Sequence, residues 1–329
     1  MKTPWELLKE SKTKIKTTWR IAFVSALVLG LLIHLPVMLS DIPNHDGLSS
    51  MYFDQNMITS GRWFLTVACG FSSYFTIPWV IGLIGLIWLA LTAAVLTEVL
   101  ELTDPVTITV VSGLLVSFPA LASTFAYVFT MDGYMLALFL AVLAVLFTAK
   151  YPRGYLAGAV CLAFSMGIYQ AYLPFTILLC VYKILLYFME EKGWKEKAKY
   201  VCHYLGMGIA GGVLYYVILQ ILLKLQGRVL DTYQGINSME QMGSGMGILA
   251  TIKGMYVDFL AFTVHGNVLV NNIFSLAACI ILVATVVFLV IRSMIWRKWW
   301  KNPAFFVIMI LLGISMPLLT NVILLISPN

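Results

Sequence analysis

Long apolar stretches constrain this chain more than any other feature of its sequence. A helix needs about 20 mostly apolar residues to cross about 30 Å of hydrocarbon. Nine segments approach or meet that length and leave no room for a soluble domain. We therefore predict a single all-α integral membrane domain over residues 1–329. The predicted spans are 20–40, 77–98, 106–128, 133–149, 154–168, 171–189, 203–224, 268–291 and 304–326.

The fifth and sixth of these spans meet at a polar junction. Tyrosines, a glutamine and a proline at membrane depth predict a break in the helix or a re-entrant turn, which is tolerated where irregular backbone lines a cavity. The junction reads Gly167-Ile168-Tyr169-Gln170-Ala171-Tyr172-Leu173-Pro174.

Composition agrees with a lipid-facing surface and excludes several function classes. Charged residues make up 11% of the chain, against about 25% in soluble domains. The net charge of +6 lies mainly between the spans and no nucleic-acid-binding motif accompanies it, so we expect no nucleic-acid partner. The five cysteines lack paired spacing, and neither CxxC nor HExxH occurs, so we expect no zinc site.

The distribution of basic residues predicts the orientation of the spans. With the N-terminus in the cytoplasm, 17 of the 21 lysines and arginines fall on the cytoplasmic side. The exceptions are Arg62, Lys224, Arg228 and Lys253. This excess is the positive-inside signal and predicts a multi-pass protein of the cell membrane. Residues 1–19 mix lysines with Trp5 and apolar residues, which is typical of a basic helix lying on anionic membrane lipids.

Two long outer loops, 41–76 and 225–267, are the expected place for function, because spanning helices leave little freedom for chemistry. In the first loop, apolar residues recur at helical spacing between positions 47 and 60, which predicts an interfacial helix. The glycine-rich middle of the second loop lacks the strand context and lysine spacing of a nucleotide-binding loop. It is interpreted either as a flap over a site or as a tether.

The first outer loop carries the main candidates for chemistry. Asp46 follows the first span by a few residues, so its carboxylate should lie near the membrane surface, where partial desolvation suits a general base. Arg62, beside Trp63, can hold a phosphate in two hydrogen bonds. His45 and Asp54 are further candidates. The alternatives are that Asp46-Gly47 forms an ordinary turn and that Asp54 is a solvated loop residue.

A second group of candidates reaches the same predicted face from other spans. Asp132 begins the fourth span and is either a site carboxylate or the N-cap of that helix, two roles that are compatible. Tyr169 and Gln170 approach from the junction of the fifth and sixth spans. Two carboxylates, one arginine and a polar break at one membrane surface would serve no purpose in a simple scaffold.

Four ordered motifs resemble the polytopic glucosyltransferase family whose best-known members decorate the O-antigen of enteric bacteria. The resemblance covers about the first 190 residues by motif and the remainder only by hydropathy. The motifs are Asp46-Gly47, Gly61-Arg62-Trp63, Thr130-Met131-Asp132-Gly133-Tyr134 and Gly167-Ile168-Tyr169-Gln170-Ala171.

The resemblance implies a GT-C-like fold and an enzyme that uses a polyprenyl-phosphate-sugar donor. Such enzymes transfer a sugar, here expected to be glucose, to a cell-surface polysaccharide or glycolipid outside the membrane. They usually do so without a metal, so the resemblance implies no metal and no cofactor. It assigns the base to Asp46 and implies site roles for Asp132, Arg62, Tyr169 and Gln170. With the chemistry of the loops, it predicts an inverting displacement in which Arg62 and Lys253 stabilise the departing phosphate.

Two departures from the family pattern bear on this expectation. Enteric relatives usually have adjacent acidic residues where this chain has His45-Asp46, which leaves the identity of the base open. The chain is also shorter than typical members. Either terminal helices are absent from this sequence, or the family pattern is reduced here and another membrane subunit supplies part of the acceptor site.

Two other function classes compete with a transferase. A transporter or flippase for a lipid-linked sugar predicts paired ionisable residues at mid-membrane depth and an internal repeat. His34 and His203 are the nearest deep candidates, and we find no repeat. A non-catalytic scaffold for a cell-wall enzyme would not need the polar residues of the outer loops.

Overall fold

The computed structural model describes Thr3 and residues 15–40, 45–50, 53–70, 72–75, 77–230, 248–265, 272–301 and 303–325. These residues are mainly helical, and the one β-type contact among them is an isolated bridge between Met57 and Arg62. The chain forms two compact units. One comprises Met1–Lys183 with Ala198–Val229, and the other comprises Ile184–Lys197 with Leu230–Asn329.

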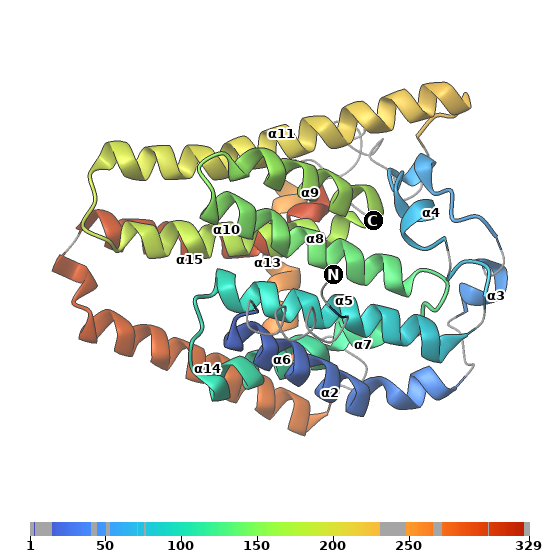
Figure 1. Cartoon of the computed structure of the whole chain (residues 1–329). Coiled ribbons are helices and arrows are strands. Elements are labelled where there is room, and N and C mark those ends of the chain that lie inside the picture. Colours follow the sequence, from blue (N-terminus) through green and yellow to red (C-terminus); the bar gives the residue numbers. More distant parts are fainter. Residues whose placement is uncertain are drawn as a thin grey trace. The chain divides into compact units, whose positions relative to one another are not determined.

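The first unit is a bundle of helices (Figure 1). Its central helices, α5 (Pro78–Val99) and α8 (Met131–Lys150), pack against each other. α2 (Thr17–Leu39) covers α5 and also packs on α6 (Pro105–Ser117), while α9 (Gly154–Ile168) covers α8. α5 and α8 are therefore largely buried, whereas α2 keeps apolar side chains on its outer face, as a lipid-facing helix does.

The third predicted span, 106–128, is wrong as one continuous helix. α6 ends at Ser117 and the short helix α7 (Pro119–Thr124) follows, because the residue before a proline is disfavoured in helical conformation. The break leaves the carbonyl of Val116 without a helical partner, and the Nε2 of His34 lies 2.9 Å from that oxygen. The His34 ring also stacks on Phe125 at 3.8 Å, so this buried histidine has a structural role.

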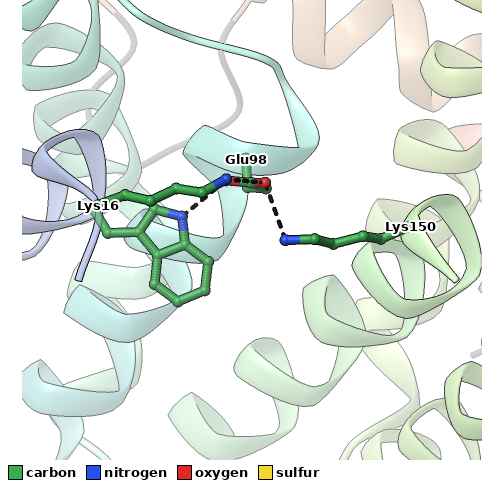
Figure 2. A network of polar contacts seen from close by, with 4 residues as sticks. Lys16, Glu98 and Lys150 are labelled. Atoms are coloured by element: carbon green, nitrogen blue, oxygen red, sulfur yellow. Dashed lines mark hydrogen bonds and ion pairs between the residues drawn. The ribbon is translucent and has the colours of Figure 1, made fainter. Parts of the chain in front are cut away.

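A charged network joins three helices at one end of the bundle (Figure 2). The Lys16 Nζ lies 2.6 Å from the Oε2 of Glu98, and the Lys150 Nζ lies 3.3 Å from its Oε1. The indole of Trp19 donates to Glu98 Oε2 at 3.1 Å. Since these residues belong to the start of α2, the end of α5 and the end of α8, the single carboxylate holds those three ends together.

The predicted break between the fifth and sixth spans is confirmed. α9 ends at Ile168, Tyr169 is extended with φ −155°, and the 3₁₀ helix η2 (Gln170–Tyr172) leads into α10 (Leu173–Phe188). After α10 the long helix α11 (Trp194–Gln226) begins. The break exposes polar backbone and side chains of this junction to the first outer loop, as described below.

The second unit contains α13 (Ile248–His265), α14 (Ile273–Trp296), η3 (Trp299–Lys301), α15 (Pro303–Thr320) and η4 (Val322–Leu325). α13 packs on α14 and α15. The Asn321 amide donates to the carbonyl of Met255 at 3.1 Å. Within the second predicted outer loop, 225–267, residues 248–265 form this helix, in which Met255 is fully buried, and the placement of the segment on the outer side stays a prediction. The glycine-rich middle of that loop, 239–247, lies outside the described residues.

Among the described residues, six helices are long and apolar enough to cross a membrane, and three shorter apolar helices fall within or overlap the other predicted spans. The six are Thr17–Leu39, Pro78–Val99, Met131–Lys150, Gln170–Phe188, Trp194–Gln226 and Leu276–Trp296. The described part of the chain is thus a helical membrane protein, while nine spans and a GT-C-like arrangement stay predictions. The basic helix expected over 1–19 falls mostly outside the described residues, apart from Thr3 and positions 15–19.

Candidate active site

The first outer loop folds as short pieces, and the helix predicted between positions 47 and 60 is wrong as a continuous element. The loop contains α3 (Gly47–Ser50), η1 (Ile58–Ser60) and α4 (Leu65–Ala68), with non-helical backbone at 53–57. The Met57 carbonyl accepts hydrogen bonds from the backbone N–H groups of Ser60 and Arg62. These bonds close a turn over residues 57–62, and Gly61 ends η1 with φ 79°, a conformation that glycine adopts without steric cost.

This 57–62 turn continues into a segment that is packed on the end of α9. Trp63 is almost fully buried against Gly167, and its indole meets the ring of Phe164 edge to face at 5.2 Å. The Phe64 N–H donates to the carbonyl of Gly167 at 2.7 Å. Figure 1 shows α4 at the end of the first unit where α9 finishes and α8 begins. The loop is therefore part of the bundle's packed structure at this end.

Arg62, the residue before Trp63, lies against two tyrosine side chains. Its Nη1 donates to the hydroxyl of Tyr134 at 3.4 Å, and its guanidinium carbon lies 5.2 Å from the centre of the Tyr169 ring. Tyr134 and Tyr169 stack on each other at 4.4 Å. The Arg62 Nε is buried without a hydrogen-bond partner, and none of the described carboxylates forms an ion pair with Arg62. A guanidinium with unused donors and no counter-ion is suited to an anionic ligand.

Gln170 and Tyr215 hold the backbone directly before Arg62. The Gln170 Nε2 donates to the carbonyl of Ser60 at 3.2 Å and to the hydroxyl of Tyr215 at 3.1 Å. The Tyr215 hydroxyl, carried by α11, donates in turn to the carbonyl of Gly61 at 3.0 Å. The loop is thus tied to two helices that are far apart in sequence.

Asp132 lies buried in the first turn of α8, and Thr130, not Asp132, is the N-cap residue of that helix. The expectation that Asp132 caps the helix is therefore wrong. Its Oδ1 accepts hydrogen bonds from the Ser72 hydroxyl at 2.6 Å and from the Gly133 N–H at 2.9 Å. A carboxylate in this first turn also interacts favourably with the helix dipole. Asp132 therefore connects the end of the first outer loop to α8.

Two of the predicted site carboxylates lie near Cys69. Its side chain is fully buried, and burial raises the pKa of its thiol to about 12, with further upward contributions from the nearby charges of Asp132 and Asp54. Asp54 itself accepts a hydrogen bond from the hydroxyl of Thr66, at the start of α4. The fold thus brings Asp54 and Asp132 near the same loop segment, although they are distant in sequence.

Asp46 and Lys253 are not among the residues that form these contacts. The Asp46 Oδ1 lies 2.9 Å from the Nε2 of His45, and both side chains are accessible to solvent. Lys253 is exposed on α13 in the second unit. Joint action of these residues with Arg62 stays a prediction.

Comparison with known proteins identifies the family. A family model described as glucosyl transferase GtrII matches residues 35–329. The chain belongs to this family. No curated protein and no solved structure matches the chain. The predicted resemblance to O-antigen-modifying glucosyltransferases is confirmed, and the match extends well beyond the first 190 residues that carry the motifs.

The candidate site includes residues that sequence reasoning left without a role. Tyr134 stands inside one of the quoted motifs, and its pairing with Arg62 depends on where the loop folds back. Ser72 and Tyr215 carry no signal in the sequence, since a serine or tyrosine near a span is ordinary. Within the described residues, no group of three or more histidine, cysteine or carboxylate side chains is arranged to hold a metal ion. The expectation that the enzyme needs no metal or cofactor stays a prediction.

Proposed function

We propose that this glucosyl transferase takes glucose from a polyprenyl-phosphate carrier and transfers it to a cell-surface polysaccharide or glycolipid on the outer face of the cytoplasmic membrane. The observation that carries the proposal is Arg62, a guanidinium with a buried, unused Nε and no carboxylate partner within the described structure. A monophosphate on a lipid carrier supplies the negative charge that this guanidinium lacks. The phosphate also lies at the membrane surface, where the first outer loop is predicted to be.

The reaction that fits these groups is a single inverting displacement. The acceptor oxygen forms a bond to the anomeric carbon, while the bond from that carbon to the phosphate oxygen breaks and its electron pair stays on the phosphate. The acceptor proton passes to the carboxylate of Asp46, which is accessible to solvent. Arg62 stabilises the charge on the departing phosphate. No metal or cofactor enters this proposed reaction.

The other predicted residues take supporting roles in this proposal. Asp132 is buried and its Oδ1 accepts hydrogen bonds from Ser72 and Gly133, which suits holding the loop more than removing a proton. In this proposal Asp54 and His45, both exposed, contact the sugar or the acceptor. Tyr169 stacks below the guanidinium, where it limits the positions that Arg62 can adopt.

The donor assay tests the proposal directly. Purified protein in lipid nanodiscs receives radiolabelled glucose either on polyprenyl phosphate or on a nucleoside diphosphate, together with a glycan acceptor. We expect transfer only from the lipid carrier, loss of turnover in Asp46→Asn, and weaker donor use in Arg62→Lys. Full transfer by Asp46→Asn would remove Asp46 from the mechanism, and transfer from the nucleotide sugar alone would refute the donor class.

Matched variants control for damage to the fold. Arg228→Lys makes the same change at an exposed arginine outside the site, and donor use should be unaltered. Asp104→Asn replaces the N-cap carboxylate of α6, and asparagine is an equally good cap, so the fold should persist with full activity.

The orientation needs its own measurement. The outer-face assignment is supported by the 17 of 21 basic residues that share the predicted cytoplasmic side. A cysteine placed at position 46 should react with an impermeant maleimide from outside intact cells, and one at position 195 only after lysis. The reverse labelling would refute the orientation.

The buried side chain of His34 does not support the transporter alternative. His34 satisfies the carbonyl at the end of α6 and stacks on an aromatic ring, which accounts for its burial without an ion pathway. In the donor assay a flippase would move the lipid across the bilayer and leave the sugar–phosphate bond intact.

A further inference from the structure

We infer that Tyr215 and Gln170 are positioning residues that set the direction of the Arg62 guanidinium toward the donor phosphate. The inference rests on the proposed phosphate role of Arg62. It also changes the predicted role of Gln170, which was expected to contact substrate, and it assigns a role to Tyr215, which no motif singled out.

The hydrogen bonds of this pair leave few donors for a ligand. Gln170 uses one N–H for the carbonyl of Ser60 and the other for the hydroxyl of Tyr215. Tyr215 uses its only O–H for the carbonyl of Gly61 and is itself buried. All three polar hydrogens are therefore committed to the protein. Such a pair can orient a neighbouring group but has no donor left for a sugar or phosphate.

The two carbonyls that the pair holds belong to the residues immediately before Arg62. After Arg62, the chain is held again by the hydrogen bond from Phe64 to Gly167. Arg62 therefore lies between two anchored points, one supplied by η2 and α11 and the other by the end of α9. Its side chain crosses the Tyr169 ring, and Tyr169 is the residue next to Gln170. A shift of Gln170 would thus move both the backbone and the ring on which the guanidinium rests.

The Tyr215 hydroxyl is the part of this arrangement that a single substitution can remove. Tyr215→Phe keeps the ring and its packing near Trp63, whose centres are 6.4 Å apart. It leaves the Gly61 carbonyl and one Gln170 N–H without partners, so the 57–62 turn loses its connection to α11. Misplacing a binding group by about 1 Å can reduce rates by up to about 100-fold. We expect the KM for the lipid-phosphate donor to rise about tenfold, while the KM for the acceptor stays the same.

Tyr204→Phe is the matched control. Tyr204 lies on the same helix, is equally buried, and also has a hydrogen-bonded hydroxyl, 3.1 Å from that of Tyr200. If the Tyr215 hydroxyl only stabilises the fold, both variants should lower the melting temperature without changing donor KM. If it positions Arg62, only Tyr215→Phe should raise donor KM.

A double-mutant cycle separates this inference from the function on which it rests. With Arg62→Lys already present, Tyr215→Phe should add little further loss of donor use, because both changes disturb one interaction. An unaltered donor KM in Arg62→Lys would refute the phosphate role itself. A raised KM in Arg62→Lys together with an unaltered one in Tyr215→Phe would refute the positioning role alone. Should Tyr215→Phe fail to fold, Gln170→Met removes the other bond that the pair makes to this turn, the one to the Ser60 carbonyl, and is judged by the same two outcomes.

Discussion

Gly167 is the position where a single methyl group should test the contact between the first outer loop and the bundle. A Cβ added there would lie 2.6 Å from the Cε2 and 2.7 Å from the Cζ2 of Trp63, whereas ordinary contacts begin at 3.4 Å. The indole cannot retreat freely, because Phe64, Phe164 and Tyr215 surround it with ring centres 5.2–6.4 Å away. Gly167→Ala should therefore force the ring and its backbone outward.

The magnitude follows from this crowding. Overpacking a filled site costs about 1–3 kcal/mol, and about 1.4 kcal/mol corresponds to a tenfold change in an equilibrium. Because Arg62 is adjacent to Trp63, the displaced loop should also misplace the guanidinium. We expect a lower melting temperature in detergent. We also expect glucosyl transfer to fall by a larger factor than the amount of folded protein does.

The control is Gly208→Ala on α11, where an added Cβ meets nothing within 4 Å. Alanine in a helix is favoured over glycine by up to about 1 kcal/mol, so this variant should be as stable as the original chain or more stable, with full activity. If Gly167→Ala behaved in the same way, the loop would not be packed against α9 as described, and the geometry of the candidate site would be refuted.

Four further predictions concern buried and charged groups. Asp132→Ala should destabilise the fold by about 1–3 kcal/mol, because it removes the buried oxygen that accepts from the Ser72 hydroxyl and the Gly133 N–H. Asp132→Asn keeps an acceptor oxygen and should cost less, so equal melting temperatures of the two variants would contradict this prediction. Glu98→Ala should cost about 1 kcal/mol or less, with a smaller effect at high salt, because the lysines around it are partly exposed; an effect independent of salt would contradict it. At pH 8, maleimide should label the exposed Cys202 but not the buried Cys69. The raised pKa of Cys69 keeps a proton on the folded chain that the unfolded chain loses near pH 9, so stability should fall as the pH rises from 9 toward 12. In Cys69→Ala that part of the pH dependence should be absent.

Corrections to the predicted elements have local causes that hydropathy does not register. The span expected over 106–128 reads as uniformly apolar, yet Pro119 ends α6 at Ser117. The helix expected between positions 47 and 60 has suitable spacing of apolar residues. It is interrupted where the chain closes the 57–62 turn, with Gly61 in the left-handed region. Hydropathy averages over a window, whereas a proline or a positive φ acts at one residue.

The candidate site was predictable in part because some of its chemistry needs rare residues. An arginine predicted on the outer face stands out in a chain with few outside charges, and Asp132 stands out at the start of an apolar span. Hydroxyls and amides do not stand out in this way. Tyr215 is one of 16 tyrosines, and its bond to the Gly61 carbonyl joins residues that are 154 positions apart.

The sequence by itself determined the class of molecule. Apolar length and the scarcity of charge require helices in a membrane, because hydrocarbon offers no partner for free backbone groups or isolated charges. The ordered motifs also placed the chain among glucosyltransferases before any fold was known, and the family match confirms that placement. Composition and the order of motifs along the chain do not depend on how the chain folds back on itself.

The tertiary structure alone decided which residues act together. Trp63 meets Gly167, Ser72 meets Asp132, and Gln170 with Tyr215 holds the turn before Arg62. Each of these contacts joins the first outer loop to a helix that lies at least 60 residues further along the chain. The physical reason is that hydrogen bonds and close packing act over a few ångströms in space. Proximity of that kind depends on the folded path of the backbone and leaves no periodic signal in the sequence.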